Sequence, residues 1–426
     1  MKKFLAMLLA LVMALSLVAC GEQKQPDTPD VPDDGQQTAT VKVGFITLHD
    51  ENSTYDKNFI NAAKEAIANL GLTDADYILK TNVPEGQECY EAAVDMVDKG
   101  CNIIFADSFG HEPFMIQAAQ EYPNVQFCHS TGTRAHTEGL ANYHNAFASI
   151  YEGRYLAGIA AGLKLNEMID AGKFSADEAL VGYVGAYTYA EVVSGYTSFF
   201  LGVRSVCPTA TMKVTFTGSW YDEALEKEGA QKLIDMGCKL ISQHADSMGA
   251  PTACENANIP NVSYNGSTGE ACPNTYIISS RINWAPYYEY AIKAVMDGTT
   301  IDTDWTGTLA TGSVVLTDLN TAVAAEGTAE AIAAATEKLE KGELHVFDTA
   351  TFTTRADDTM NQFKVDFLKV DADGHITSYL ADVDTDAAYT GDTEVVHDGY
   401  FAESEKRSAP YFDLEIDGIE RLDTKM

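Results

Sequence analysis

The stretch from residue 41 to residue 71 reads VKVGFITLHDENSTYDKNFINAAKEAIANLG, and it decides the fold. It opens with a β-rich apolar run, Val41–Ile46, and passes through a polar loop. In Asp56–Leu70, apolar residues then recur at helical spacing, and Gly71 follows as a natural C-cap. The stretch predicts a strand, a loop and an amphipathic helix, which is the first unit of an α/β fold.

The same alternation continues along the chain and restarts once, so the sequence predicts two successive α/β lobes, each with a parallel sheet flanked by helices. The further expected strands are Tyr77–Leu79, Asn102–Ala106, Val125–Cys128, Ala179–Val184, Thr211–Phe216, Leu240–Gln243, Val262–Tyr264 and Tyr276–Ile278. The further expected helices are Glu88–Val97, Glu112–Glu121, Ser149–Leu165, Tyr189–Val203, Asp222–Met236, Pro251–Asn258 and Trp284–Met296. In Ser149–Leu165, the many small residues predict close approach of another element.

After Gly298 the pattern changes. The expected strand-like pieces there are Gly312–Leu316, Glu343–Phe347 and Phe363–Lys369. An Ala-rich helix is expected at Thr328–Lys341 and a hairpin turn at Asp371–Gly374. The tail through Ile419 is expected to pack on one lobe or across the hinge. The expected domain limits are a signal peptide at 1–19, a lipidated tether at 20–40, a first lobe at 41–150, a second lobe at 151–275, and a hinge crossover with a C-terminal segment at 276–426.

The N-terminus carries the pattern of an exported lipoprotein. Lys2 and Lys3 precede an apolar run, Phe4–Ala19, which is short for a membrane span. Leu17-Val18-Ala19-Cys20-Gly21 forms a lipobox, in which the Cys20 thiol accepts the lipid. Residues 22–40 are rich in Pro, Asp, Gln and Thr and predict a flexible tether. We therefore expect lipid anchoring on Cys20 at the outer face of the cell membrane.

Charge and cysteine content exclude several classes of function. The formal net charge of −35 argues against binding to nucleic acid, which needs a basic face. No CxxC pair is present, so neither a zinc site nor any other metal or cofactor is expected. Seven cysteines follow Cys20, and we expect them to behave as small buried hydrophobes: Cys89, Cys101, Cys128, Cys207, Cys238, Cys254 and Cys272.

Aromatic and short polar residues gather in the loops that follow the expected strands. Ligands of open α/β sheets bind at the carboxyl ends of the strands, so these loops predict a ligand cleft between the lobes. Asp56 and Asp222 also fit as helix N-caps. The candidate ligand-binding residues are Tyr55, Asp56, Asn58, Phe59, Asp107, Phe109, Tyr187, Trp220, Asp246, Gly266, Asn283 and Trp284. Enzyme signatures such as GxSxG, HExxH and Walker A are absent from the sequence, which favours binding without catalysis.

Five short motifs resemble the basic-membrane-protein family of substrate-binding lipoproteins, the purine-nucleoside-receptor-like group that feeds ABC transporters. They are VGFI with YDKNF (43–46, 55–59), YEGRYLAG (151–158), GSWYD (218–222), HADS (244–247) and NWAPYY (283–288). The resemblance implies a type I periplasmic-binding fold that captures a purine nucleoside or nucleobase as a monomer and delivers it to a membrane permease.

The resemblance also implies roles for individual residues. Phe59 and Trp220 would sandwich the base, and Asp56, Asn58 and Asp107 would lie near its polar edge. Asp246, Gly266 and the Ser279–Trp284 segment would hold the sugar side. The chain departs from the family pattern where Ile282 or Asn283 replaces a lysine and where Ile60 replaces an asparagine, which makes the ribose half of the site the uncertain half. Two alternatives from other classes remain open: an extracellular sugar or autoinducer sensor, and a surface hydrolase using a Cys or an Asp.

Overall fold

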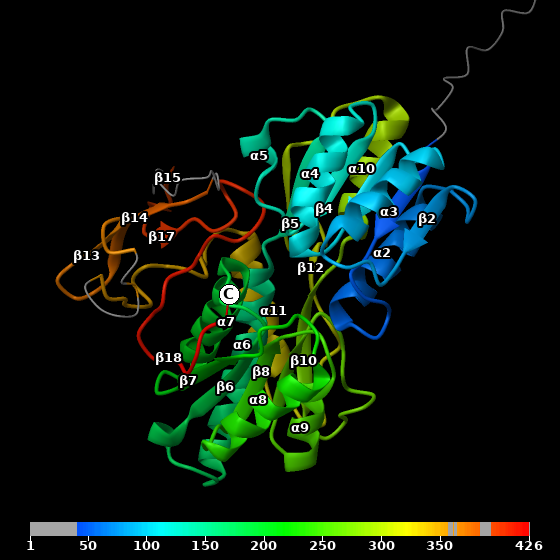
Figure 1. Cartoon of the computed structure of the whole chain (residues 1–426). Helices are drawn as coiled ribbons and strands as arrows, with labels where there is room; N and C mark the ends of the chain where they lie inside the picture. Colours follow the sequence, from blue (N-terminus) through cyan, green and yellow to red (C-terminus); the bar gives the residue numbers. More distant parts are fainter. Residues whose placement is uncertain (1–40, 357–360, 362–363, 384–392, 426) are drawn as a thin grey trace, which may run out of the picture. The chain divides into compact units, whose positions relative to one another are not determined.

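The computed structural model describes residues 41–356, 361, 364–383 and 393–425. The expected signal peptide, Cys20 and the tether lie outside the described residues. From Ala39 onward the chain forms one compact unit. Two parallel sheets, each covered by helices on both faces, are built one after the other along this unit (Figure 1). The predicted two-lobe α/β fold is confirmed.

The first sheet has the strand order β11-β5-β4-β3-β1-β2, and all its neighbours are parallel. Helices α2 and α10 pack on one face of it, and α3 and α4 pack on the other. The strands are β1 (Val43–Ile46), β2 (Tyr77–Lys80), β3 (Ile103–Ala106), β4 (Gln126–Ser130), β5 (Tyr143–Ala148) and β11 (Asp304–Gly307). The helices are α2 (Thr54–Asn69), α3 (Gln87–Asp98), η1 (Phe109–His111), α4 (Glu112–Glu121), α5 (Ala135–Glu138) and α10 (Ala285–Asp297).

The second sheet has the strand order β12-β10-β9-β8-β6-β7-β18, and only β12 runs antiparallel to its neighbour. Helices α6 and α7 cover one face, and α8 and α9 cover the other. The strands are β6 (Leu180–Gly185), β7 (Thr211–Phe216), β8 (Leu240–His244), β9 (Asn261–Tyr264), β10 (Tyr276–Ile282), β12 (Val314–Leu316) and β18 (Ile419–Arg421). The helices are α6 (Ile150–Asp170), η2 (Ala176–Glu178), α7 (Ala190–Val206), α8 (Glu223–Asp235), α9 (Gly249–Ala257) and α11 (Thr328–Glu340).

The chain crosses between the lobes three times: after β5, after β10 and after β11. The range 276–426 therefore supplies parts to both lobes, because α10 and β11 belong to the first, whereas β10, β12 and β18 belong to the second. A further set of short strands follows α11: β13 (Leu368–Val370), β14 (Ile376–Ala381), β15 (Thr393–Glu394), β16 (Val396–His397) and β17 (Tyr400–Phe401). As predicted, the tail packs on a lobe, since β18 pairs with β7 of the second sheet.

Glycines in α6 let α7 approach closely, as the small residues of this segment predict. A Cβ added to Gly158 would lie 2.1 Å from the Phe199 carbonyl oxygen, and one added to Gly202 would lie 2.0 Å from the Tyr155 carbonyl oxygen. Any side chain at either position would separate the two helices. This helix pair forms the floor of the second lobe and carries residues of the site described below.

One predicted strand is wrong, and another is shorter than predicted. Glu343–Phe347 is a bent and irregular segment that ends in a turn. The Phe347 ring stacks on that of Phe412, with 4.3 Å between the ring centroids. In Phe363–Lys369 the strand begins only at Leu368, and Phe363 lies outside the described residues. The hairpin turn at Asp371–Gly374 is confirmed between β13 and β14, where the Asp371 carboxylate accepts backbone N–H groups.

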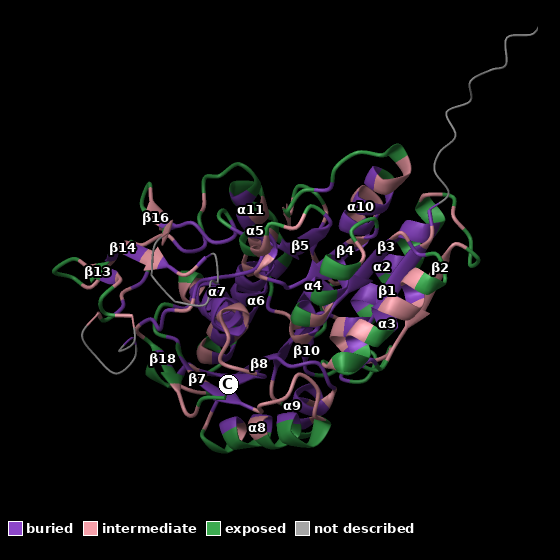
Figure 2. Cartoon of the chain, turned by 45° about the horizontal axis from the view of Figure 1, so that its top comes forward, coloured by how far each residue is buried: buried purple, intermediate pink, exposed green. Residues whose placement is uncertain are grey.

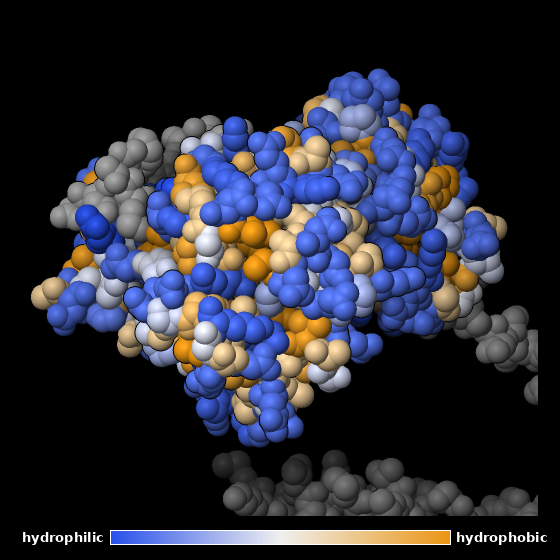
Figure 3. Space-filling model, turned by 90° about the horizontal axis from the view of Figure 1, so that it is seen from below, coloured by the Kyte–Doolittle hydropathy of each residue, from blue (hydrophilic) through white to orange (hydrophobic). Residues whose placement is uncertain are grey.

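The seven cysteines are buried and unpaired, as predicted. Burial colours in Figure 2 show buried strands and an exposed outer face on α8. The face seen in Figure 3 is mostly hydrophilic, with separate apolar patches. Among the residues that the structure describes, no helix is both long and apolar enough to cross a membrane.

Candidate functional site

A narrow cavity lies between the two lobes. Its first-lobe wall comes from loops after β1, β3 and β4, and its second-lobe wall from α7 and the loops after β7 and β8. These are the carboxyl ends of parallel strands, where α/β folds bind ligands. The lining residues are Leu48, His49, Tyr55, Asp56, Ser108, Phe109, Thr131, Glu191, Trp220, His244 and Asp246.

The loop after β1 is held by Asp56, which is not the N-cap of α2 as predicted. The helix begins at Thr54, so Ser53 is the N-cap, and the Ser53 hydroxyl accepts the Asp56 backbone N–H at 3.2 Å. The Asp56 carboxylate accepts the His49 backbone N–H at 2.8 Å and the Ser53 hydroxyl at 2.5 Å. Burial acts to raise the pKa of Asp56, but hydrogen bonds from His49 and Ser53 outweigh it and lower that pKa. Asp56 therefore remains an anion at the cavity.

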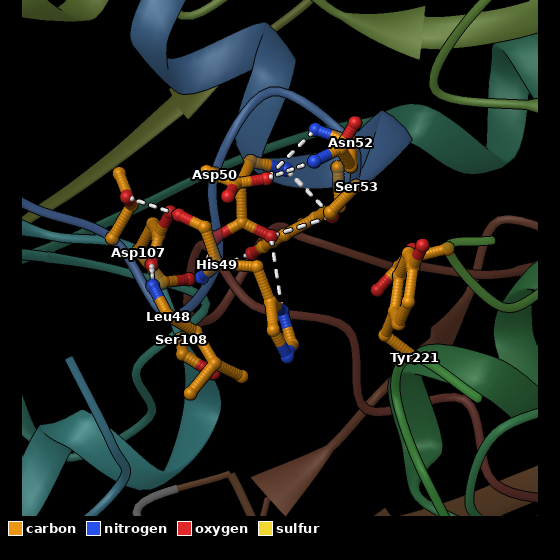
Figure 4. Close-up of polar contacts among 12 residues, drawn as sticks. Leu48, His49, Asp50, Asn52, Ser53, Asp107, Ser108 and Tyr221 are labelled. Carbon is orange, nitrogen blue, oxygen red and sulfur yellow. Dashed lines mark hydrogen bonds and ion pairs between the residues drawn. The ribbon is translucent and has the colours of Figure 1, made fainter. Parts of the chain in front are cut away.

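His49 extends from this loop on the side of the cavity that faces the second lobe (Figure 4). Its ring centroid lies 5.4 Å from that of Tyr221, and its Nδ1 lies 3.4 Å from the Asp56 carboxylate. The imidazole thus closes the cavity between a charged group of one lobe and an aromatic ring of the other.

Asp107 follows β3 and is 1% exposed. One carboxyl oxygen accepts the Leu48 N–H at 3.1 Å, and its buried Oδ2 has no partner among the described residues. Its backbone carbonyl accepts the Tyr55 hydroxyl at 2.7 Å. Burial and the negative charge of Asp56 raise the pKa of Asp107 well above its usual value. Asp107 therefore places a second buried carboxyl group, whose charged form is disfavoured, behind Asp56.

Asp246 brings a carboxyl group without a hydrogen-bond partner among the described residues to the second-lobe wall of the cavity. Its side chain is buried at 4% exposure, lines the cavity and accepts no hydrogen bond from the described residues. Burial, and then the charges of Asp56 and Glu226, raise its pKa well above the usual value. Its backbone is fixed on both sides, since its N–H donates to the Trp220 carbonyl and its carbonyl accepts the Thr54 N–H, each at 3.0 Å. The carboxyl group is thus held in place with its hydrogen-bonding capacity unused.

A buried arginine stands behind Asp246. Arg154 of α6 is 1% exposed, donates to the Gln243 carbonyl at 3.0 Å and lies 3.3 Å from the ring centroid of Tyr264. Its Nε and Nη2 have no hydrogen-bond partner within the described part of the chain.

Burial lowers the pKa of His244 to about 4, although the Glu191 carboxylate, 3.4 Å away, acts to raise that pKa. His244 is therefore neutral beside one guanidinium and one carboxylate.

Aromatic rings form a continuous wall along one side of the cavity. The Tyr187 ring meets the Trp220 ring edge-on at 5.1 Å and stacks on Tyr189 at 5.1 Å. Tyr189 in turn stacks on Phe109 of the first lobe at 5.0 Å. Trp220 and Phe109 line the cavity, whereas Tyr187 supports Trp220 from behind. A flat ligand can stack on such a wall.

Several predicted residues lie away from the cavity lining. Phe59 stacks on Trp284 at 4.5 Å, and both are 1% exposed in the first-lobe core. The sandwich of Phe59 and Trp220 that the resemblance implies is therefore not formed here, because Phe59 is packed against a different ring. Asn283 donates to the Gly312 carbonyl at 3.2 Å, between two of the lobe crossovers. A ligand contact by these residues stays a prediction.

Asn58 and Gly266 lie where the lobes touch. The Asn58 amide donates to the Asn265 side-chain oxygen at 3.3 Å, and Gly266 follows Asn265 directly after β9. Together with the Thr54–Asp246 backbone bond, this contact closes the cavity from one side.

The structure brings together Tyr55, Asp56, Phe109, Trp220 and Asp246 of the predicted set. Glu191, His244 and Arg154 were missed as site residues. Arg154 carried one signal, since a charged residue stands inside a helix of small and apolar residues, where burial requires a partner or a function. His244 stands two residues before the predicted Asp246 in the HADS motif, and Glu191 lies in the first turn of the helix after β6.

Two α/β lobes around a small closed cavity, joined by three crossovers, define a hinged solute-binding protein. Residues 44–345 match the family described as ABC transporter substrate-binding protein PnrA-like. The chain belongs to this family, and it is an extracytoplasmic solute-binding protein of an ABC transporter.

The chain is 32% identical over 262 residues to a purine-binding protein of Brucella abortus, covering 61% of this chain and 70% of the relative. It is also 32% identical to a Haloferax volcanii protein named as a candidate ABC transporter glucose-binding protein, covering 63% of this chain and 64% of that one. A solved ABC transporter solute-binding protein of Aeropyrum pernix has a TM-score of 0.61 at 17% identity, covering 76% of this chain and 96% of that one. That likeness supports the fold alone.

Proposed function

We propose that the solute is a purine base or purine nucleoside, held between the lobes and released to a membrane permease without chemical change. The observation that carries the proposal is that the Trp220 ring and the unpartnered carboxyl group of Asp246 line the same narrow cavity. A purine ring stacks on the indole, and its amino group or a ribose hydroxyl donates to Asp246.

Two further features support a purine. Asp56 lines the cavity as a carboxylate and offers an acceptor to a ring or amino N–H. The relative from Brucella abortus is named for purine binding.

A sugar is the second candidate. Three carboxyl groups and His244 line the cavity, and such groups bind vicinal hydroxyls as well as amino groups. The Haloferax volcanii relative is named for glucose. A sugar ring also stacks on an indole, so the aromatic wall alone does not decide between the two.

For the rest of the molecule we propose an exported, monomeric lipoprotein, cleaved before Cys20 and lipidated on it. Residues 20–40 would then tether the lobes to the membrane and keep them close to the permease, which raises their effective concentration there. Mass spectrometry of the protein from membranes tests this assignment: we expect a diacylglyceryl Cys20 at the N-terminus, and a Cys20→Ala chain that remains unprocessed.

A ligand panel tests the purine assignment. Adenine, adenosine, guanosine and glucose are compared by thermal shift and calorimetry on the wild type and on Trp220→Ala. We expect a purine to raise the melting temperature, and Trp220→Ala to weaken its binding by about 5- to 150-fold, the equivalent of ~1–3 kcal/mol for one stacked base. The matched control is Trp305→Phe, because Trp305 stacks on Tyr290 in the first lobe. Binding of glucose with no response to any purine would transfer the assignment to the sugar.

A further inference from the structure

A second cavity lies on the second lobe, where the chain beyond the family match packs against α6 and α11. The family match ends at residue 345, and the following segment, drawn in orange to red, lies beside the second lobe (Figure 1). This C-terminal cavity encloses about 570 Å³. Its lining residues are Tyr151, Glu152, Leu339, Gly342, Leu344, His345, Val346, Phe347, Tyr400, Phe401, Glu403 and Glu405. Because half of the wall comes from residues after 345, relatives limited to the matched region lack it.

Two carboxyl groups in the wall, those of Glu152 and Glu403, form no ion pair within the described residues, whereas Glu405 pairs with His397. Glu152, in the first turn of α6, has a buried Oε2 without any partner in the described part of the chain. Glu403 is 3% exposed and accepts the backbone N–H groups of Tyr411 at 2.6 Å and Phe412 at 2.8 Å. Neither Lys nor Arg is among the lining residues. Burial raises the pKa of both Glu152 and Glu403 to about 7, which shows how poorly their charge is compensated.

Aromatic rings make up much of the remaining wall. Tyr151 lies 5.5 Å from Phe347 between ring centroids, and its hydroxyl donates to the Glu403 carbonyl at 3.2 Å. The Tyr400 ring stacks on His345 at 3.8 Å, and its hydroxyl donates to Glu405 at 3.0 Å. The rings are thus fixed by the same carboxylates and backbone groups that bring negative charge to the cavity.

We propose that the C-terminal cavity is a second ligand site, for an organic ammonium ion with an apolar body. An ammonium group gains from aromatic faces through cation–π attraction and from a carboxylate through charge-assisted hydrogen bonds. The carboxyl group of Glu152 supplies the acceptor, the partly exposed rings of Tyr151 and Tyr400 supply the faces, and Leu344 supplies apolar contact. A bare metal ion fits less well, because no three metal-ligating side chains come together within the described residues.

The test uses benzylamine as the probe and benzyl alcohol as its neutral counterpart, with calorimetry on the full chain. We expect benzylamine to bind and benzyl alcohol to bind at least tenfold more weakly. Glu152→Gln keeps the shape of the side chain but removes its charge, and should weaken benzylamine by about 10- to 100-fold. The control on the same helix is Glu167→Gln, whose side chain is exposed and pairs with Lys164; it should bind as the wild type does.

Two further variants keep the result interpretable. Tyr400→Leu removes one aromatic face and should also weaken benzylamine, and its thermal melting shows whether the lobe is intact. Trp220→Ala alters only the cavity between the lobes, so its benzylamine affinity should equal that of the wild type whatever solute the protein carries. The proposal is overturned if no benzylamine binding is detected, if the alcohol binds as tightly, or if Glu152→Gln changes nothing.

Discussion

Asp246→Asn should weaken solute binding and at the same time stabilise the empty protein. The Asp246 carboxyl group is buried, lines the cavity and accepts no hydrogen bond from the described residues, while Asp56, Glu226 and Glu191 raise its pKa. In the empty protein near neutral pH, this group is therefore under electrostatic strain. Asparagine has nearly the same shape and carries no charge, so the substitution isolates that effect.

The two magnitudes follow from the same group. Relief of a buried, unpaired carboxyl group is worth about 1–2 kcal/mol, which for a body of this size raises the melting temperature by about 1–3 °C. Loss of the carboxyl group as an acceptor for a ligand N–H or O–H costs about 1–3 kcal/mol, or roughly a 5- to 150-fold rise in Kd.

Thermal melting without ligand and calorimetry with the best ligand of the panel measure the two effects on one protein sample. Asp235→Asn is the control, because Asp235 is exposed on α8 and is held only by Gln231; neither quantity should change. If Asp246→Asn melts at a lower temperature and binds solute as the wild type does, Asp246 is a structural residue and the account of the site is refuted.

Three other predictions follow from contacts already described. Asn58→Ala and Asn265→Ala should each weaken solute binding by about 2- to 10-fold, because each removes the contact that holds the lobes closed, and the double variant should bind solute no more weakly than either single variant. If Asn58 contacted the ligand directly and Asn265 did not, Asn265→Ala would bind solute as the wild type does. Gly158→Ala should cost about 1–3 kcal/mol in urea unfolding, because its Cβ meets the α7 backbone, while Gly229→Ala on α8, with its nearest contact at 3.4 Å, should be neutral or stabilising. The buried His244 has a pKa of about 4 in the folded protein, so as pH falls below 6.5 the unfolded chain takes up the proton first and the fold loses stability. Relative to His244→Gln, the wild type should lose roughly 2–3 kcal/mol of its free energy of unfolding between pH 7 and 4.5, and parallel stability curves of the two proteins would contradict this.

Most of the fold could be predicted because most strands are apolar runs and most helices are amphipathic. β5 was not predicted, because His144 and Asn145 interrupt its apolar pattern. Both are buried polar residues satisfied by long-range bonds, His144 with Gln126 at 2.9 Å and Asn145 with the Ala135 N–H at 2.7 Å. β11 escaped because it joins the first sheet beside β5 from far along the chain, and no local pattern encodes such a partner.

The site was predicted in outline for a physical reason and missed in detail for another. Parallel strands place their following loops at one edge, so Tyr55, Phe109, Trp220 and Asp246 could be expected to meet. Which of two neighbouring side chains faces the cavity depends on helix rotation and on lobe packing. Phe59 points into the core beside Trp284 for that reason, although it stands only four residues after Tyr55.

Tryptophan fluorescence tests the central claim most directly, namely that a flat purine-like solute stacks on Trp220 between the lobes. The chain has three tryptophans, and Trp284 and Trp305 both lie in first-lobe packing away from the cavity lining. We predict that adenine or adenosine quenches the emission in a saturable way in the wild type, and that the quenching disappears in Trp220→Phe. Saturable quenching that persists in Trp220→Phe, or a response to glucose with none to any purine, would contradict the account.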